Sequence, residues 1–131
     1  ETLNGTEPDS LFIAREGDEM VGVVSLDSCV RRGKKIVRAS GRGATANVVP
    51  CISNLVVRKD RRGEGFARQM IAAIEEQVKA WGYNEMYLLV DATNDPAIRL
   101  YETSGYIIIT SEVFNVLRPA GFLVATKDVN V

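Results

Sequence analysis

From residue 52 to residue 67 the chain reads Ile-Ser-Asn-Leu-Val-Val-Arg-Lys-Asp-Arg-Arg-Gly-Glu-Gly-Phe-Ala. The first six residues predict a buried strand, the next four a charged turn, and a helical pattern follows towards Trp81. Glycines let the backbone turn sharply and approach a ligand closely. The first N–H groups of a helix have no partner within it, and the helix dipole adds positive charge there. The stretch therefore predicts a site for a phosphorylated cofactor.

Composition limits the kind of protein that contains this stretch. We expect a single domain, because 131 residues can bury one core. Apolar residues make up 46% and charged residues 25%, which is typical of soluble globular proteins. The net charge of −1 gives no general attraction for nucleic acid. No apolar run approaches the roughly 20 residues of a membrane span, and two cysteines are too few for a disulfide framework, so we expect a soluble intracellular protein.

The chain contains no histidine, which restricts its chemistry. Ser-His-Asp and Cys-His catalysis are excluded, and so is a zinc site with histidine ligands; we expect no metal. A general base must then be a carboxylate, a tyrosine, a lysine, an ordered water or the substrate itself. The two cysteines, Cys29 and Cys51, are too few for a disulfide framework and are expected to pack in strands.

The first half of the chain is predicted to form strands. Residues 1–10 are polar and expected to be a loose end. Leu11–Arg15 and Met20–Val30 predict a hairpin, and Cys51–Val57 predicts a central strand. Residues 31–46 are basic and contain glycine, so we interpret them as a long hairpin loop with Ile36-Val37 briefly extended. This loop either faces solvent or meets an acidic peptide, RNA or a larger assembly.

The second half of the chain alternates helices and strands. Phe66–Trp81 has helical spacing and Gly82 follows as a cap. Glu85–Asp91 is expected to be a strand, and a second helix opens at Asn94-Asp95-Pro96 and ends at Gly105. Two further strands are predicted, at Tyr106–Ile109 and Phe122–Thr126. The order β-β-β-α-β-α-β-β predicts an α/β (α+β) fold with a mixed sheet.

Two other phosphate-binding motifs are excluded. No G-x-x-x-x-G-K-[ST] P-loop occurs in the chain. Residues 41–46 match G-x-G-x-x-A by letter, but a dinucleotide fingerprint must follow a strand and open a helix. Here the motif leads into Val48-Val49-Pro50, which favours extended chain.

Two motifs in order resemble the GNAT N-acetyltransferase superfamily. Residues 62–67, Arg-Gly-Glu-Gly-Phe-Ala, look like its R-x-x-G-x-G/A acetyl-CoA loop. Residues 94–106 look like its N-x-x-A-x-x-L-Y-x-x-x-G-F/Y signature. The resemblance extends over roughly Leu11 to Thr126. The sequence is similar to plant-type plastid members of the family, so the plastid stroma is an expected compartment beside the cytoplasm. It implies a mostly antiparallel sheet with a splayed central strand and flanking helices, from which N-terminal elements are missing.

The resemblance also implies where acetyl-CoA would bind. Pantetheine would pair with the backbone of Leu55, Val56 and Val57, and an N–H near Val56 would stabilise the oxyanion. Backbone amides of the loop would hold the pyrophosphate, namely those of Gly63, Glu64, Gly65, Phe66, Ala67 and Arg68. Arg62 would add charge, or is a solvated turn residue. Asn94 would contact pantetheine, cap the second helix, or do both.

Catalysis by such a protein transfers an acetyl group directly to an amine, either a protein N-terminus or lysine or a small amine. Tyr101 would donate a proton to the departing thiolate, although a packed core tyrosine is the alternative. Many members of the family have a glutamate where this chain has Ser53 and Asn54. Asp91 is the nearest candidate base, or a surface turn residue. The missing glutamate keeps a second hypothesis open, an inactive GNAT-fold subunit of a larger assembly.

Overall fold

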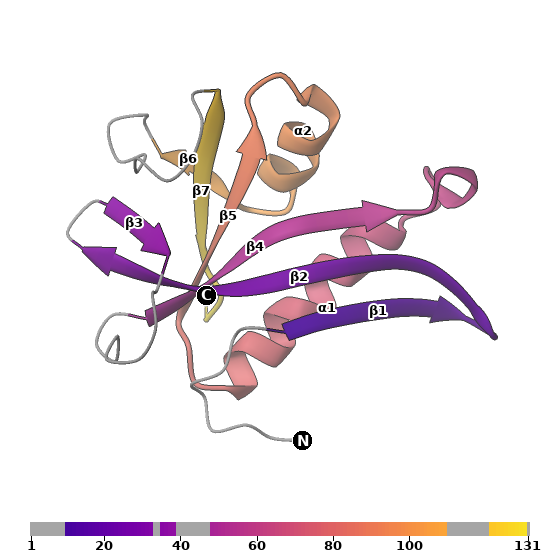
Figure 1. Ribbon diagram of the computed structural model, residues 1–131, viewed down its shortest axis with the longest axis horizontal. Coiled ribbons are helices and arrows are strands. Elements are labelled where there is room, and N and C mark those ends of the chain that lie inside the picture. Colours follow the sequence, from indigo (N-terminus) through magenta and orange to yellow (C-terminus); the bar gives the residue numbers. More distant parts are fainter. Residues whose placement is uncertain (1–9, 33–34, 39–47, 110–120, 131) are drawn as a thin grey trace.

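The computed structural model describes residues 10–32, 35–38, 48–109 and 121–130. Seven strands, two α-helices and one 3-10 turn form in these ranges (Figure 1). The strands are β1 (Ser10–Glu16), β2 (Glu19–Arg32), β3 (Lys35–Arg38), β4 (Val48–Val57), β5 (Glu85–Asp91), β6 (Ile107–Ile109) and β7 (Phe122–Asp128). The helices are α1 (Phe66–Ala80) and α2 (Asp95–Thr103), and the 3-10 turn is η1 (Lys59–Arg61).

The strands form one sheet in the order β1-β2-β4-β5-β7-β6, and β3 pairs with β2. All pairs are antiparallel except β4 with β5. These two parallel strands pair only at Cys51 with Tyr87 and at Ile52 with Leu88. Beyond that point they diverge, and Figure 1 shows β4 turning away from β5 towards η1. The predicted mixed sheet with a splayed central strand is therefore confirmed.

A bulge in β4 lies at the point where the two strands part. Ser25 pairs with Asn54 and Leu26 pairs with Ile52, so that Ser53 has no counterpart on β2. An extra residue of this kind bends a strand and changes which side chains face the core. Ile52 before the bulge and Val57 after it both belong to the main core, whereas Asn54 is exposed.

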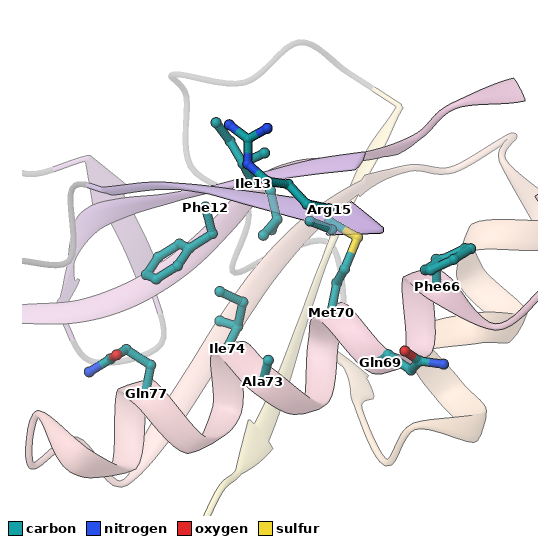
Figure 2. A pocket seen from close by; sticks show the side chains of 11 residues that line it. Phe12, Ile13, Arg15, Phe66, Gln69, Met70, Ala73, Ile74 and Gln77 are labelled. Carbon is teal, nitrogen blue, oxygen red and sulfur yellow. The ribbon is translucent and has the colours of Figure 1, made fainter. Parts of the chain in front are cut away.

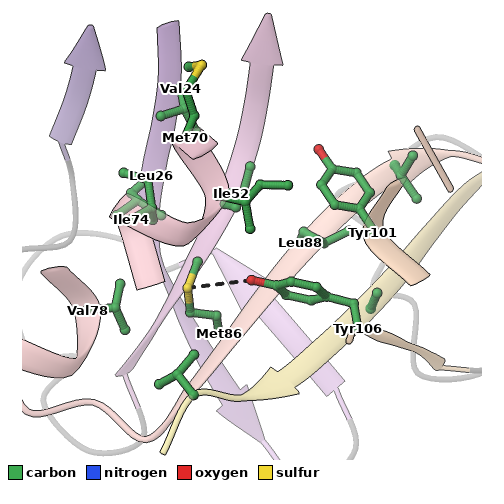
Figure 3. Close-up of a cluster of buried hydrophobic side chains, with 14 of the residues drawn as sticks. Val24, Leu26, Ile52, Met70, Ile74, Val78, Met86, Leu88, Tyr101 and Tyr106 are labelled. Atoms are coloured by element: carbon green, nitrogen blue, oxygen red, sulfur yellow. Dashed lines mark hydrogen bonds between the residues drawn. The ribbon is translucent and has the colours of Figure 1, made fainter. Parts of the chain in front are cut away.

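The main core lies between the sheet and the two helices (Figure 3). In α1 the buried residues recur at helical spacing, namely Met70, Ile71, Ile74 and Val78. They pack against alternate residues of the strands, including Val24, Leu26, Ile52, Met86 and Leu88. Helix α2 contributes Tyr101, and Tyr106 follows it into the same core. A smaller cluster contains Cys29, Val49, Cys51, Tyr87 and Val124.

The basic segment is the main correction to the predicted elements. Residues 31–46 were expected to be a long hairpin loop with Ile36-Val37 briefly extended. That extended pair is confirmed, but the strands are longer than expected: β2 continues to Arg32, and Lys35–Arg38 forms β3, which pairs antiparallel with β2. Backbone pairing with β2 extends this strand beyond the two β-branched residues that indicated it. Residues 33–34 and 39–47, like the predicted loose end at 1–9, lie outside the described residues. In the described part of the chain, no helix is long and apolar enough to span a membrane.

Candidate active site

The turn between β4 and α1 leaves the start of α1 open. Gly65 precedes the helix with a φ of 90° and Gly63 has a φ of 84°, a left-handed conformation that favours glycine. A Cβ atom would meet nothing within 4 Å at Gly63, and only the Gln69 side chain at 3.9 Å at Gly65. Among the described residues, no side chain caps the first N–H groups of α1 and no acidic residue lies in its first turn. These N–H groups are therefore available to an anion.

Ion pairs hold this turn against the β1–β2 hairpin. The Arg61 guanidinium pairs with Glu16 of β1 and, at 3.2 Å, donates to the Glu64 carboxylate. It also lies 5.0 Å from the centre of the Phe66 ring. Arg58 makes a second link, at 3.3 Å to Glu19. Glu64 thus has an internal partner, and Arg61 is a residue of the site that the sequence motif did not identify.

Beyond the splay, none of the described strands pairs with this edge of β4. The backbone N–H of Arg58 donates to Val21 O on β2 at 2.7 Å. Because backbone groups of alternate residues face the same partner strand, those of Val56 also face β2, and those of Leu55 and Val57 face the gap. The N–H groups near Val56 that face the gap are therefore those of its two neighbours. At the end of this edge, Arg62 Nε donates to Val57 O at 2.9 Å, which places the guanidinium beside the gap.

Tyr101 is buried, with 5% of its surface exposed. Its ring meets that of Tyr106 edge to face, with 6.0 Å between centroids. In Figure 3 the Tyr106 hydroxyl points to Met86, whereas the Tyr101 hydroxyl points elsewhere. No described residue forms a hydrogen bond with the Tyr101 hydroxyl, and desolvation by burial raises its pKa to about 12. The phenol therefore stays protonated and can donate to a ligand.

Asn94 and Asp91 lie at the carboxyl end of β5. The Asn94 side chain accepts from the Ala97 N–H at 3.2 Å, which confirms its predicted role as the N-cap of α2. Asp91 is exposed and accepts from the hydroxyl of Thr93 at 2.7 Å and from its N–H at 2.9 Å. These hydrogen bonds lower the pKa of Asp91. They make Asp91 a weaker base, as expected of a turn residue.

Arg68 connects the two helices that flank the site. From the first turn of α1 it donates to Thr103 Oγ1 at 3.1 Å, at the end of α2, and to Ser104 Oγ at 3.4 Å. The glycine turn and the helix that contains Tyr101 are therefore neighbours in space, and Leu55 and Val57 pack against the same core as Tyr101. Ala67 is half-buried on the first turn of α1.

A cavity of about 380 Å³ lies on the other side of α1 (Figure 2). Its walls are mostly apolar and come from β1, β2 and α1, including Phe12, Ala14, Val24, Met70 and Ile74. Phe66 is the one predicted site residue that it contains. Arg15 is the one charged residue in a lining that is otherwise mostly apolar, so this cavity suits a pyrophosphate less well than the open start of α1 does.

The family is now clear from sequence comparison. Residues 1–106 match the family model described as the acetyltransferase (GNAT) family, and the chain belongs to that family. It is 28% identical over 99 residues to N-alpha-acetyltransferase 30 of Schizosaccharomyces pombe. That alignment takes in 76% of this chain and 58% of the relative, so the chain spans little more than half of the relative's length.

Two solved structures have the same fold. Arabidopsis thaliana Naa50, in complex with the bisubstrate analogue CoA-Ac-MVNAL, superposes with a TM-score of 0.64 at 19% identity, over 90% of this chain and 72% of that one. The NatC complex bound to Gag peptide and CoA also gives a TM-score of 0.64, at 17% identity, over 90% of this chain and 70% of the other. Both identities are low enough that the likeness concerns the fold alone.

Proposed function

We propose that this protein is an N-acetyltransferase that moves the acetyl group of acetyl-CoA to an amine by direct attack in a ternary complex. The main observation is the open start of α1 beside the free edge of β4. Tyr101 belongs to the same core, and its hydroxyl has no hydrogen-bond partner among the described residues. A protein N-terminus is the leading acceptor, because the relative is named as an N-alpha-acetyltransferase and the Naa50 structure holds a peptide-bearing analogue. A lysine side chain or a small amine is the next candidate.

The cofactor would lie along three consecutive parts of the site. The N–H groups of residues 63–68 bind the pyrophosphate, and the Arg62 guanidinium adds positive charge at the end of β4. The outward backbone groups of Leu55 and Val57 pair with the pantetheine amides as an added strand. The side-chain oxygen of Asn94 is already used as the cap of α2. Its NH2 group has two donors left for the pantetheine.

The transfer itself forms one C–N bond and breaks one C–S bond. The amine nitrogen attacks the thioester carbonyl, and the oxyanion accepts a hydrogen bond from the N–H of Leu55 or Val57. The sulfur leaves as a thiolate and accepts a hydrogen bond from Tyr101. Because burial raises the pKa of Tyr101 to about 12, well above the roughly 8.5 of a thiol, this phenol stabilises the thiolate more readily than it protonates it.

The amine must lose a proton, and the described residues at the splay offer no strong base for this step. Asn54 and Ser53 occupy the splay and neither accepts a proton at neutral pH. The pKa of Asp91 is lowered by its hydrogen bonds with Thr93. We therefore assign proton removal to water, with Asp91 as the alternative acceptor.

The test is release of CoA from acetyl-CoA with a panel of peptides and polyamines. Tyr101→Phe should lower kcat by about 10- to 1,000-fold and leave the KM for acetyl-CoA nearly unchanged. Asp91→Asn should retain kcat within about 3-fold if water removes the proton. Equal turnover in Tyr101→Phe would remove Tyr101 from the mechanism, and a large loss in Asp91→Asn would identify it as the base.

The second candidate function is a subunit that holds CoA without turnover. The observation in its favour is that Asn54 and Ser53 lie where a catalytic carboxylate would serve, and the NatC structure shows that this fold occurs within a complex. Binding of acetyl-CoA without transfer to any amine, together with stable co-purification of partner proteins, would support this alternative.

A further inference from the structure

We propose that Glu75 and Lys127 are positioning residues for Tyr101, acting through Tyr106. This inference rests on the proposed function, because it assigns Tyr101 a place at the reacting sulfur. The three side chains Glu75, Tyr106 and Lys127, which we call the Glu75 clamp, come from α1, the segment after α2, and β7.

The Glu75 clamp is a closed set of contacts. The Tyr106 hydroxyl donates to Glu75 Oε2 at 2.9 Å. Lys127 Nζ donates to both oxygens of the same carboxylate, at 3.0 and 3.2 Å. The ammonium also lies 5.7 Å from the centre of the Tyr106 ring. One carboxylate therefore fixes a phenol and an ammonium at once, and the side chains are 15% exposed for Glu75 and 26% for Lys127.

The clamp also holds the end of the helix that contains Tyr101. Lys127 Nζ donates to the carbonyl of Ser104 at 2.8 Å, just after the last turn of α2. A cation at this end of a helix satisfies a carbonyl and complements the dipole. Through Lys127 and Glu75, α2 is attached to α1, which begins directly after the glycine loop. The distance between the loop and Tyr101 thus depends on this connection.

Tyr106 transmits the position of the clamp to Tyr101. The two rings meet edge to face with 6.0 Å between centroids, so a shift of one ring displaces the other in a densely packed core. The Tyr101 hydroxyl has no hydrogen-bond partner among the described residues, so packing alone orients it. A misplacement of about 1 Å far from the chemistry can lower a rate by roughly 100-fold.

The experiment compares Glu75→Gln, Lys127→Met and Tyr106→Phe with wild type in acetyl-CoA turnover. Each should lower kcat by about 10-fold and keep the KM for acetyl-CoA within about 2-fold. Lys127→Arg, which retains the charge, should recover most of the loss. Glu76→Gln is the matched control: it breaks an exposed pair with Lys79 on the same helix, at 3.2 Å, and should change neither parameter. Val78→Ala, a buried change on α1, serves as the control for loss of stability alone.

A second measurement does not depend on turnover. With tyrosine labelled by ¹³C at Cζ, the Tyr101 signal, assigned by its absence in Tyr101→Phe, should shift in Glu75→Gln and stay unchanged in Glu76→Gln. An unchanged Tyr101 signal, or a kcat loss no greater than that of Val78→Ala, would overturn the proposal. If wild type acetylates no amine, the proposed function fails, and the NMR comparison alone decides whether the clamp positions Tyr101.

Discussion

At the scale of single residues, two buried phenols should make stability depend on alkaline pH. Burial raises the pKa of Tyr101 to about 12 from 10.0, and burial together with the neighbouring Glu75 carboxylate raises the pKa of Tyr106. Both groups are neutral in the folded state below pH 10, so their contribution to the free energy of unfolding is complete there. Above pH 10 the unfolded chain releases these protons first, and that contribution is lost as pH rises towards the folded pKa.

Urea unfolding measured between pH 7 and pH 11.5 tests this expectation. The free energy of unfolding should fall more steeply above pH 10 in wild type than in Tyr101→Phe, which lacks one of the two phenols. The lysines ionise in the same range in both proteins, so the difference between the two curves isolates Tyr101. Parallel curves would show that Tyr101 ionises with an ordinary pKa.

At the scale of elements, the contact of β2 with β4 depends on the lack of a side chain at Gly22. Gly22 pairs with Val57, and a Cβ at this position would lie 2.8 Å from Val56 O and 3.0 Å from Met70 Sδ. The first neighbour is backbone and cannot rotate away. We expect Gly22→Ala to lower the free energy of unfolding by about 1–3 kcal/mol, as overpacking does.

The same substitution should also weaken the binding of acetyl-CoA, because the displaced strand provides the proposed pantetheine-binding edge. An increase of about 5-fold or more in Kd, measured by calorimetry, is expected from a backbone shift of a few tenths of an ångström at a preorganised edge. Gly82→Ala is the control, since it strains a positive φ of 96° at the far end of α1 with no atom within 4 Å. Gly82→Ala should lower the free energy of unfolding and leave the Kd for acetyl-CoA unchanged. If Gly22→Ala also leaves this Kd at the wild-type value, the β4 edge does not bind the ligand.

The sequence predicted the elements whose signals are local. The apolar spacing of Met70, Ile74 and Val78 predicted α1, and Asn94 with Pro96 predicted the start of α2. For β3 the sequence indicated only Ile36-Val37 within a hairpin loop, because the pairing of the whole strand with β2 is a contact between backbones that side-chain periodicity does not report. The bulge at Ser53 was also not predicted, since it exists only in the register between β4 and β2.

At the scale of the whole molecule, the sequence indicated the parts of the candidate site but not their relative directions. Motif spacing predicted the glycine turn and Tyr101 as separate local features. The backbone direction that turns Leu55 and Val57 towards the gap follows from strand register. In the Glu75 clamp, Tyr106 lies 31 positions and Lys127 lies 52 positions along the chain from Glu75. No local sequence pattern marks such distant pairs. Roles in binding and catalysis stay predictions until ligand and turnover are measured.

The stability of the whole domain should respond to the binding of CoA. A ligand that bridges α1 and the β4 edge binds the folded chain and has no site in the unfolded one. At 100 times its Kd, CoA should therefore raise the free energy of unfolding by about 2.7 kcal/mol, which corresponds to roughly 5–15 °C in Tm for a domain of this size. Calorimetric melting with and without CoA measures the shift.

Gly65→Glu is the variant that separates this site from any other. It places a bulky anion where the α1 N–H groups face the pyrophosphate, at a φ of 90° that a side chain rarely adopts. Its own Tm will fall, so the comparison is between the two CoA-induced shifts and not between the two melting points. The shift should shrink to less than about 2 °C in the variant, because Kd then exceeds the CoA concentration. A full shift in Gly65→Glu would mean that CoA does not bind at the start of α1.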